Sequence, residues 1–197
     1  PHGSTGSIEL ATYSNVCLIA ALILLILSSR IKSDIMAEVG AAFMWVSMAK
    51  IVVVDVIAQN PLITKFDTGE FPLFNWLLYI YAVPLAVMFL ARRLHFRQAG
   101  SPSSLISASY LLNHLLAFGR VSLEVRHFFH PGGMTGGKFT LVECATYSHF
   151  WILLAALLLV FSFKFETPFS MPAAVMILVF AIVKIFMGEV TKDSPVV

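Results

Sequence analysis

The sequence predicts an all-α integral membrane protein with six transmembrane helices, and three observations support this fold class. Hydrophobic residues make up 58% of the 197 residues and charged residues only 12%, which is typical of membrane proteins. The apolar runs are continuous rather than alternating, which favours helices over a β-barrel. A short motif also occurs twice, which indicates an internal repeat.

The repeated motif is Glu9-Leu-Ala-Thr-Tyr-Ser14, which returns as Glu143-Cys-Ala-Thr-Tyr-Ser148 after 134 residues. The offset continues without a gap through the helices that follow. Three charged pairs fall in register at this offset: Arg30 with Lys164, Lys50 with Lys184, and Asp55 with Glu189. We therefore predict that residues 9–56 are repeated at 143–190 as parallel copies, not as the inverted pair of many transporters.

The repeat also predicts the domain organisation, because one period contains four helices. Residues 8–141 then form one four-helix unit and residues 142–197 form the first half of the next, within a single transmembrane bundle over residues 1–197. The opening segment Pro1–Ser7 is similar to the Gly-rich loop His130–Gly137, so we interpret it as a native loop rather than a cloning remnant. We expect the chain to be a piece of a longer protein.

Six apolar segments approach the ~20 residues that a helix needs to cross the hydrocarbon core of a bilayer. Basic residues fall in alternate loops, at Arg30, Arg93 and Lys164. The positive-inside rule therefore predicts that these loops are cytoplasmic and that both termini lie on the outer side. The predicted spans are Thr12–Ser29, Ile35–Ile57, Phe74–Ala91, Leu105–Phe129, Tyr147–Phe163 and Ser170–Met187.

Two spans contain residues with a specific local prediction. In the second span, Lys50 and Asp55 are five residues apart, so a regular α-helix points them to different faces. In the third span, Pro84 is expected to produce a kink. Amphipathic rings in the same span are typical of a membrane interface, and these are Trp76, Tyr79 and Tyr81.

Charge and cysteine content exclude several other classes. The net charge of +2 comes from basic residues in short loops that form no patch, so nucleic acid is not an expected partner. Cys17 and Cys144 are expected inside and near the end of membrane helices, so neither a disulfide nor a cysteine metal site is predicted. The N-terminus lacks the pattern of a signal peptide.

In the predicted orientation, nearly every ionisable side chain at membrane depth lies in the outer leaflet. Because isolated charges are costly there, we predict one polar layer in which Glu124 or Glu143 pairs with Arg126 or Lys184. The alternatives are lysines that extend to the headgroups and an Arg120–Glu124 pair with no further role. The predicted layer contains Glu9, Lys50, Asp55, Arg120, Glu124, Arg126, His127, Glu143, Tyr147, Lys184 and Glu189.

The fourth span contains the candidate chemistry. Arg120, Glu124 and His127 have i, i+4, i+7 spacing and share one helix face, and Glu124 with His127 are candidates for a catalytic acid and base. The same two residues fit the Glu-x-x-His spacing of carboxylate metal sites, which His130 and Glu143 could complete. A single copy of this spacing is common by chance, so no metal is predicted.

His114 is the other candidate ligand, because its position in mid-span could bind a haem or chlorin. No second histidine opposes it at membrane depth, and a hydrogen-bonded histidine is the more ordinary interpretation. No cofactor is therefore predicted.

Several segments together resemble a known family. Ser122-Leu-Glu-Val-Arg-His-Phe-Phe-His130, the Gly-rich loop, the second Ala-Thr-Tyr-Ser and Val183-Lys-Ile-Phe186 are similar to large bacterial polytopic proteins described only as predicted membrane proteins of unknown function. The resemblance covers essentially the whole chain, and Leu-Glu-x-Arg-His is its most specific part. It implies tandem four-helix units, but no activity. The chain has Glu189 where this family usually has an aspartate.

These observations predict a polytopic protein of the bacterial inner membrane with a transporter-like or scaffolding role in the cell envelope. Its partners would be the lipid bilayer and further repeat units or other membrane subunits. Two alternatives remain. One is a membrane-embedded enzyme acting on an extracytoplasmic glycan or lipid, and the other is a cofactor-binding subunit of a larger complex.

Overall fold

The computed structural model describes residues 2–64, 69, 71, 73–93, 103–131, 133–135, 137, 139–165 and 169–190, with the side chains of 2–5 and 187–190 excepted. The described residues are helical or irregular and contain no strand. The elements are α1 (His2–Ile31), α2 (Asp34–Lys50), η1 (Ile51–Ala58), η2 (Leu78–Ala82), α3 (Val83–Ala91), α4 (Ser103–Phe129), α5 (Leu141–Phe165) and α6 (Ser170–Val190).

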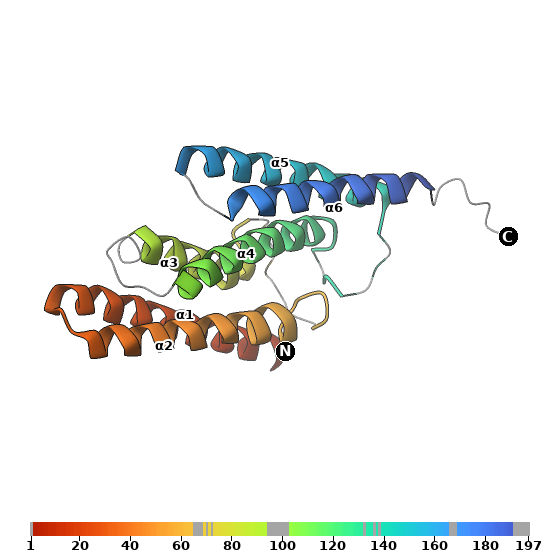
Figure 1. The fold of residues 1–197 in the computed structure, drawn as a ribbon. Helices are drawn as coiled ribbons and strands as arrows, with labels where there is room; N and C mark the ends of the chain where they lie inside the picture. The colour runs from red at the N-terminus through yellow and green to blue at the C-terminus, as the bar shows by residue number, and fades with distance from the viewer. Residues whose placement is uncertain are drawn as a thin grey trace.

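The helices form three antiparallel pairs that lie side by side (Figure 1). The α1–α2 hairpin lies on one side, the α5–α6 hairpin on the other, and α3 with α4 between them. The start of α1 and the end of α6 lie at the same end of the bundle, and the α1–α2 turn lies at the opposite end (Figure 1). Helices α1 and α5 therefore run in the same direction.

Small residues let the helices of each hairpin approach closely. Gly40 of α2 lies so near α1 that an added Cβ would be 3.1 Å from the Leu25 side chain. Ala155 and Ala174 are both buried between α5 and α6. The larger apolar cluster joins α1, α2, η2, α3 and α4. A smaller one joins α5 and α6 to Phe118 of α4, so α4 belongs to both cores.

The prediction that Lys50 and Asp55 point to different faces is wrong. Their charged atoms lie 3.7 Å apart, because the helix continues from Lys50 into the π-helical segment η1. A π-helix has hydrogen bonds between residues five apart, so a residue at i+5 returns to the same face. The α-helical spacing assumed from the sequence does not apply here.

The third predicted span also differs from its expectation. The π-helical segment η2 leads directly into α3, and Pro84 is the second residue of α3. Pro84 therefore lies inside a continuous helix, and the kink expected there stays a prediction. Tyr81 is buried in the core, and the Tyr79 hydroxyl donates to Thr12 Oγ1 at 3.2 Å. These two rings therefore pack between helices instead of forming an interfacial belt.

In both copies, the helix that contains the repeated motif begins earlier in the sequence than predicted. Residues 2–7, expected as a loop, belong to α1, and α5 begins at Leu141, six residues before the predicted start. The Ser7 hydroxyl donates to Gln59 Oε1 at 2.6 Å, which ties the first turns of α1 to the end of η1. The prediction of a loop rested on the similarity of residues 1–7 to the Gly-rich loop 130–137, and it is wrong for residues 2–7.

Three of the described helices are long and apolar enough to cross a membrane: Gly6–Ile31, Asp34–Ala58 and Leu141–Lys164. Leu78–Ala91 and Ser170–Phe186 are apolar but shorter. Helix α4 has 27 residues, which corresponds to ~40 Å at about 1.5 Å per residue, but it carries three charged side chains. The composition and these helices support a helical membrane protein.

Candidate functional site

Helix α4 presents two faces to its neighbours, and each carries polar side chains. We call the face toward the α5–α6 hairpin the hairpin face, and the face toward the segment before η2 and α3 the loop face. Residues of the hairpin face recur every four positions, so they form one continuous stripe. The hairpin face consists of His114, Phe118, Ser122, Arg126 and His130, and the loop face of Asn113, Arg120, Glu124 and His127.

The hairpin face contains a buried ion pair between α4 and the first turn of α5. Arg126 Nη1 lies 2.8 Å from Glu143 Oε1, and the two side chains are only 3% and 0% exposed. His130 Nε2 lies 2.7 Å from Arg126 Nη1 and 3.1 Å from Glu143 Oε2. Which of these two contacts is a hydrogen bond depends on the tautomer of the ring, because Nε2 without a proton accepts from Arg126 and Nε2 with a proton donates to Glu143. We predicted that Glu124 or Glu143 pairs with Arg126 or Lys184, and the pair that forms is Glu143 with Arg126.

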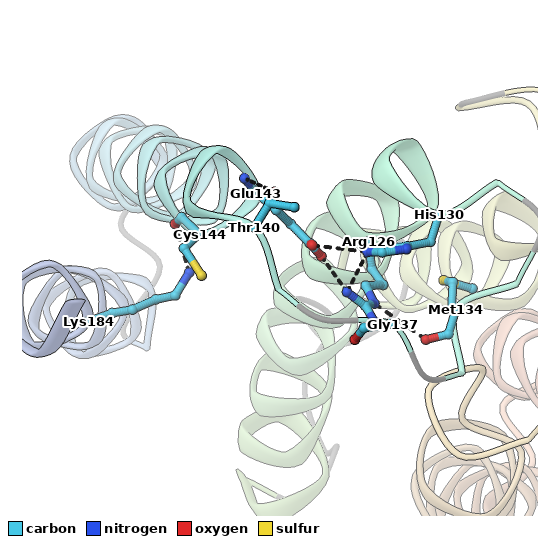
Figure 2. Close-up of polar contacts among 8 residues, drawn as sticks. All are labelled: Arg126, His130, Met134, Gly137, Thr140, Glu143, Cys144 and Lys184. Atoms are coloured by element: carbon cyan, nitrogen blue, oxygen red, sulfur yellow. Dashed lines mark hydrogen bonds and ion pairs between the residues drawn. The ribbon is translucent and has the colours of Figure 1, made fainter. Parts of the chain in front are cut away.

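Arg126 also holds the loop that leads from α4 to α5. Its Nε donates to the Met134 carbonyl at 3.4 Å and its Nη2 to the Gly137 carbonyl at 3.2 Å (Figure 2). The guanidinium lies 4.4 Å from the centroid of the Phe139 ring, a favourable cation–π arrangement. Gly137 has φ +79°, and an added Cβ would lie 3.0 Å from the His130 ring. Glycine is therefore required here.

The remaining residues of the hairpin face contact α5 and α6. The Trp151 indole donates to Ser122 Oγ at 3.0 Å, and its ring lies 5.1 Å from that of Phe118. His114 Nε2 lies 3.1 Å from the hydroxyl of Ser170 at the start of α6. His114, the candidate cofactor ligand, therefore points into a helix–helix contact. The ordinary interpretation, a hydrogen-bonded histidine, agrees with this position.

The loop face binds the backbone of Leu73, in the segment before η2. Arg120 and Glu124 form an i,i+4 ion pair. Arg120 Nη2 donates to the Leu73 carbonyl at 2.9 Å, and the Leu73 N–H donates to Glu124 Oε1. Leu73 has φ +69°, a left-handed conformation that is costly for a residue with a branched side chain. The ion pair thus binds both backbone polar groups of a strained residue.

His127 and Asn75 extend the same contact. His127 Nε2 lies 2.7 Å from the Gly69 carbonyl. Since a carbonyl only accepts, Nε2 carries a proton there. Asn75 Nδ2 donates to both Glu124 oxygens at 3.2 Å and lies 3.3 Å from His127 Nδ1. Glu124 and His127, the candidate acid and base, are therefore both occupied by protein groups.

The candidate metal ligands do not converge. Glu124 and His127 belong to the loop face, whereas His130 and Glu143 meet on the hairpin face, beside the Arg126 guanidinium. Across the part of the chain that the structure describes, no three His, Cys, Asp or Glu side chains are grouped as metal ligands would be. The suggestion that His130 and Glu143 complete a site begun by Glu124 and His127 is therefore wrong.

The two lysines of the predicted layer make equivalent contacts. Lys50 Nζ donates to the Leu10 carbonyl at 2.6 Å, and Lys184 Nζ donates to the Cys144 carbonyl at 2.8 Å. Each lysine thus binds a carbonyl 40 residues earlier, in the preceding helix of its hairpin. Figure 2 shows Lys184 reaching from α6 to the start of α5. Neither lysine extends freely to solvent.

The surroundings of the two lysines differ. Lys50 also contacts Ser14 Oγ and Asp55. The Lys184 ammonium instead lies 4.5 Å and 5.1 Å from the ring centroids of Tyr147 and Trp151. Tyr147 thus joins the layer through its ring.

The structure brings the predicted layer together in three separate clusters rather than one. These are Lys50 with Asp55, the loop face, and Arg126 with Glu143. Tyr147 and Lys184 adjoin the third cluster, because the Phe139 ring lies beside both Arg126 and Tyr147. Glu9 is exposed and contacts none of them. The side chain of Glu189 lies outside the described residues.

Sequence reasoning missed the partners that the layer binds. They are mostly backbone groups of Gly69, Leu73, Met134 and Gly137, together with the Asn75 side chain. It also missed a contact nearer the start of α4, between Asn113 and Arg92. In the amide orientation that satisfies both groups, the Asn113 side-chain oxygen accepts from Arg92 Nη1 at 3.0 Å and from Nη2 at 2.6 Å. Backbone carbonyl and N–H partners cannot be recognised from the residue types in a sequence. The only hint of these contacts in the residue types was glycine at positions 69 and 137.

Comparison with known proteins agrees with the resemblance in the sequence. The family model described as Predicted membrane protein (DUF2339) matches residues 56–192. This range includes both faces of α4 and the whole α5–α6 hairpin, but not α1 or α2. A search of curated proteins and of solved structures finds no match to the chain.

Proposed function

Because the chain belongs to the DUF2339 family of predicted membrane proteins, we propose that it is a non-enzymatic scaffold of the cell envelope, built from transmembrane four-helix units. One observation carries the proposal: the three charged residues of α4 all bind other parts of the protein. Arg120 and Glu124 hold the segment before η2, and Arg126 holds the α4–α5 loop and α5. These contacts fix helices and loops relative to each other.

The proposal includes six transmembrane helices, with α4 as the central helix, in the bacterial inner membrane. The fact that α1 and α5 run in the same direction supports a parallel repeat (Figure 1). So do the matched contacts of Lys50 and Lys184. The bilayer and further four-helix units or other membrane subunits would be its partners. On the positive-inside rule, both ends of this segment face the outer side.

The topology is tested by single cysteines in a background without Cys17 and Cys144. A membrane-impermeant maleimide applied to intact cells should label positions 68 and 136 and leave positions 30 and 97 unlabelled. Labelling at 97 from outside would show that the orientation is wrong.

The scaffold is tested by comparing stability with cellular function over one set of variants. In a strain that lacks the native gene, Glu124→Gln, His127→Asn and Arg126→Gln should lose complementation only as far as they lose folded protein in the membrane. Glu38→Gln is the control, because Glu38 is exposed on α2. An enzyme that uses Glu124 and His127 would instead lose complementation at undiminished abundance. That outcome would reject the scaffold.

The alternatives have less support in the geometry. Catalysis by Glu124 would require its carboxylate to leave Arg120, Asn75 and the Leu73 N–H. A cofactor on His114 would require its ring to leave Ser170. A visible absorption band in the purified protein that disappears in His114→Gln would favour the cofactor-binding alternative.

A further inference from the structure

The two hairpins have the same internal contact but differ in what covers them. The equivalent lysine–carbonyl bonds, Lys50 to Leu10 and Lys184 to Cys144, place the second helix of each hairpin in the same register against the first. Counterpart residues, 134 positions apart, therefore point in corresponding directions from their hairpins. A face that is buried in one hairpin can be compared directly with the same face in the other.

The face that α5–α6 presents to α4 is buried, whereas its counterpart on α1–α2 is open. Glu143 is fully buried and Tyr147 is 7% exposed. Their counterparts are Glu9, which is exposed, and Tyr13, which is 62% exposed. On the second helix of each hairpin, Ile177 is 5% exposed and its counterpart Phe43 is 45% exposed. We call Glu9, Tyr13 and Phe43 the open face.

The open face carries a carboxylate inside an apolar helix. Glu9 lies within Gly6–Ile31, one of the helices long enough to cross a membrane. No partner for its carboxylate exists among the residues that the structure describes. A carboxylate at membrane depth is costly when unpaired, and less so toward the interface. The equivalent carboxylate, Glu143, is neutralised by Arg126 at 2.8 Å.

We infer that the open face binds another membrane helix with the chemistry of the hairpin face of α4. That helix carries an arginine that pairs with Glu9 and a histidine four residues later, as Arg126 and His130 do. Its apolar side chains cover Tyr13 and Phe43, whose counterparts Tyr147 and Ile177 are buried. Charge complementarity selects this occupant, because an acidic face inside an apolar helix requires a cation from its partner.

The occupant is not the same chain's own α4, because Arg126 is already paired with Glu143. For the same reason it is not the α4 of an intact second copy. One difference between the faces also constrains the partner. Cys17 stands where α5 has Trp151, so the partner does not need a hydroxyl at the position of Ser122.

This inference rests on the proposed scaffold, whose unit-to-unit contacts it specifies. It is tested with the full chain in lipid nanodiscs and a fluorescent synthetic peptide of residues 103–137, which supplies Arg126 and His130 without α5. Energy transfer between the labelled chain and the peptide reports binding. The peptide should bind in a one-to-one complex. Glu9→Gln in the chain, or Arg126→Gln in the peptide, should each weaken binding about tenfold or more, as for a desolvated charge pair.

Two further changes make the result specific. Glu9→Gln combined with the Arg126→Gln peptide should be no weaker than either change alone, and Glu38→Gln should bind like the parent chain. Binding that depends on Glu143 instead of Glu9 would mean that the peptide has replaced the chain's own α4, and would overturn the inference. So would binding that ignores Glu9, or Glu9-dependent self-association without peptide. None of these results would alter the relation between stability and complementation that tests the scaffold.

Discussion

The two faces of α4 use the same residue types in different ways. On the hairpin face, the arginine and the glutamate come from different helices, and their ion pair is almost fully buried. On the loop face, both charges come from α4 itself, and their side chains are 13% and 14% exposed. The first pair joins two large elements. The second pair has no charged partner outside α4 among the residues that the structure describes, and it binds the backbone of Leu73.

This difference predicts where stability is concentrated. A buried pair between elements leaves an uncompensated charge when one partner is removed, which costs about 3–5 kcal/mol. An i,i+4 pair on one helix is worth only about 0.2–0.5 kcal/mol. The value of Glu124 therefore comes mainly from the Leu73 and Asn75 hydrogen bonds. The hairpin face should control global stability, and the loop face should control local order.

The largest expected effect is at the pair between α4 and α5. Glu143→Gln should lower the free energy of unfolding by about 3–5 kcal/mol, because Arg126 is left charged and buried. Denaturation in detergent, followed by circular dichroism, measures the change. Glu38→Gln should stay within about 0.5 kcal/mol of the parent, as expected for an exposed site.

The double variant Glu143→Gln/Arg126→Gln sharpens this prediction. Its loss of unfolding free energy should be smaller than the sum of the losses in the two single variants. The second substitution removes the charge that the first leaves unpaired. Strictly additive losses would show that the two groups are not coupled.

The next effect is at Glu124. Glu124→Ala removes the acceptor of the Leu73 N–H and of Asn75 and should cost about 1.5–3 kcal/mol, the net value of hydrogen bonds to a charged group. Amide hydrogen exchange can show which segment each face of α4 holds in place. Glu124→Ala should raise exchange around residues 73–78, whereas Glu143→Gln should raise it around residues 139–144. The same exchange pattern in both variants would contradict a division of labour between the faces.

Much of the fold and part of this site could be predicted from the sequence. The six apolar runs predicted six helices, and the described residues form six when η1 is counted with α2 and η2 with α3. The 134-residue offset predicted matching roles for Lys50 and Lys184, and each binds a carbonyl of the preceding helix. The energetic argument for paired charges predicted the Glu143–Arg126 contact.

The rest depended on information that residue types do not carry. The Lys50–Asp55 contact arises from a π-helical segment that no apolar periodicity indicates. The partners of Arg120, Arg126 and His127 are carbonyl oxygens of loops, and every residue has one. The division of the layer into clusters follows from which side of α4 each loop passes, and this is a property of the chain's path.

A smaller effect is expected at the other end of the hairpin face. Ser170→Ala removes the hydroxyl that contacts His114 and should cost about 1 kcal/mol, the net value of one neutral hydrogen bond. The measurement is again denaturation in detergent. A loss as large as that of Glu143→Gln would show that the buried ion pair is not the dominant contact of the hairpin face.

The smallest effect has the opposite sign and concerns the loop residue that the loop face clamps. Leu73 has φ +69° and an exposed side chain, so Leu73→Gly relieves a left-handed conformation while losing little packing. Relief of about 1–2 kcal/mol exceeds the added freedom of the unfolded chain, about 0.4–1 kcal/mol. A net gain of about 0.5–1 kcal/mol in the free energy of unfolding is expected.

The matched change on the hairpin face is Gly137→Ala, where φ is +79° and an added Cβ would lie 3.0 Å from His130. It should destabilise the protein, because both the backbone and the ring oppose the methyl group. The gain from Leu73→Gly should also shrink in the Glu124→Ala background. Without the carboxylate, nothing holds the Leu73 N–H, and the segment can relax to a negative φ by itself. An undiminished gain there would mean that the ion pair does not impose the strain, and that the loop face only tolerates it.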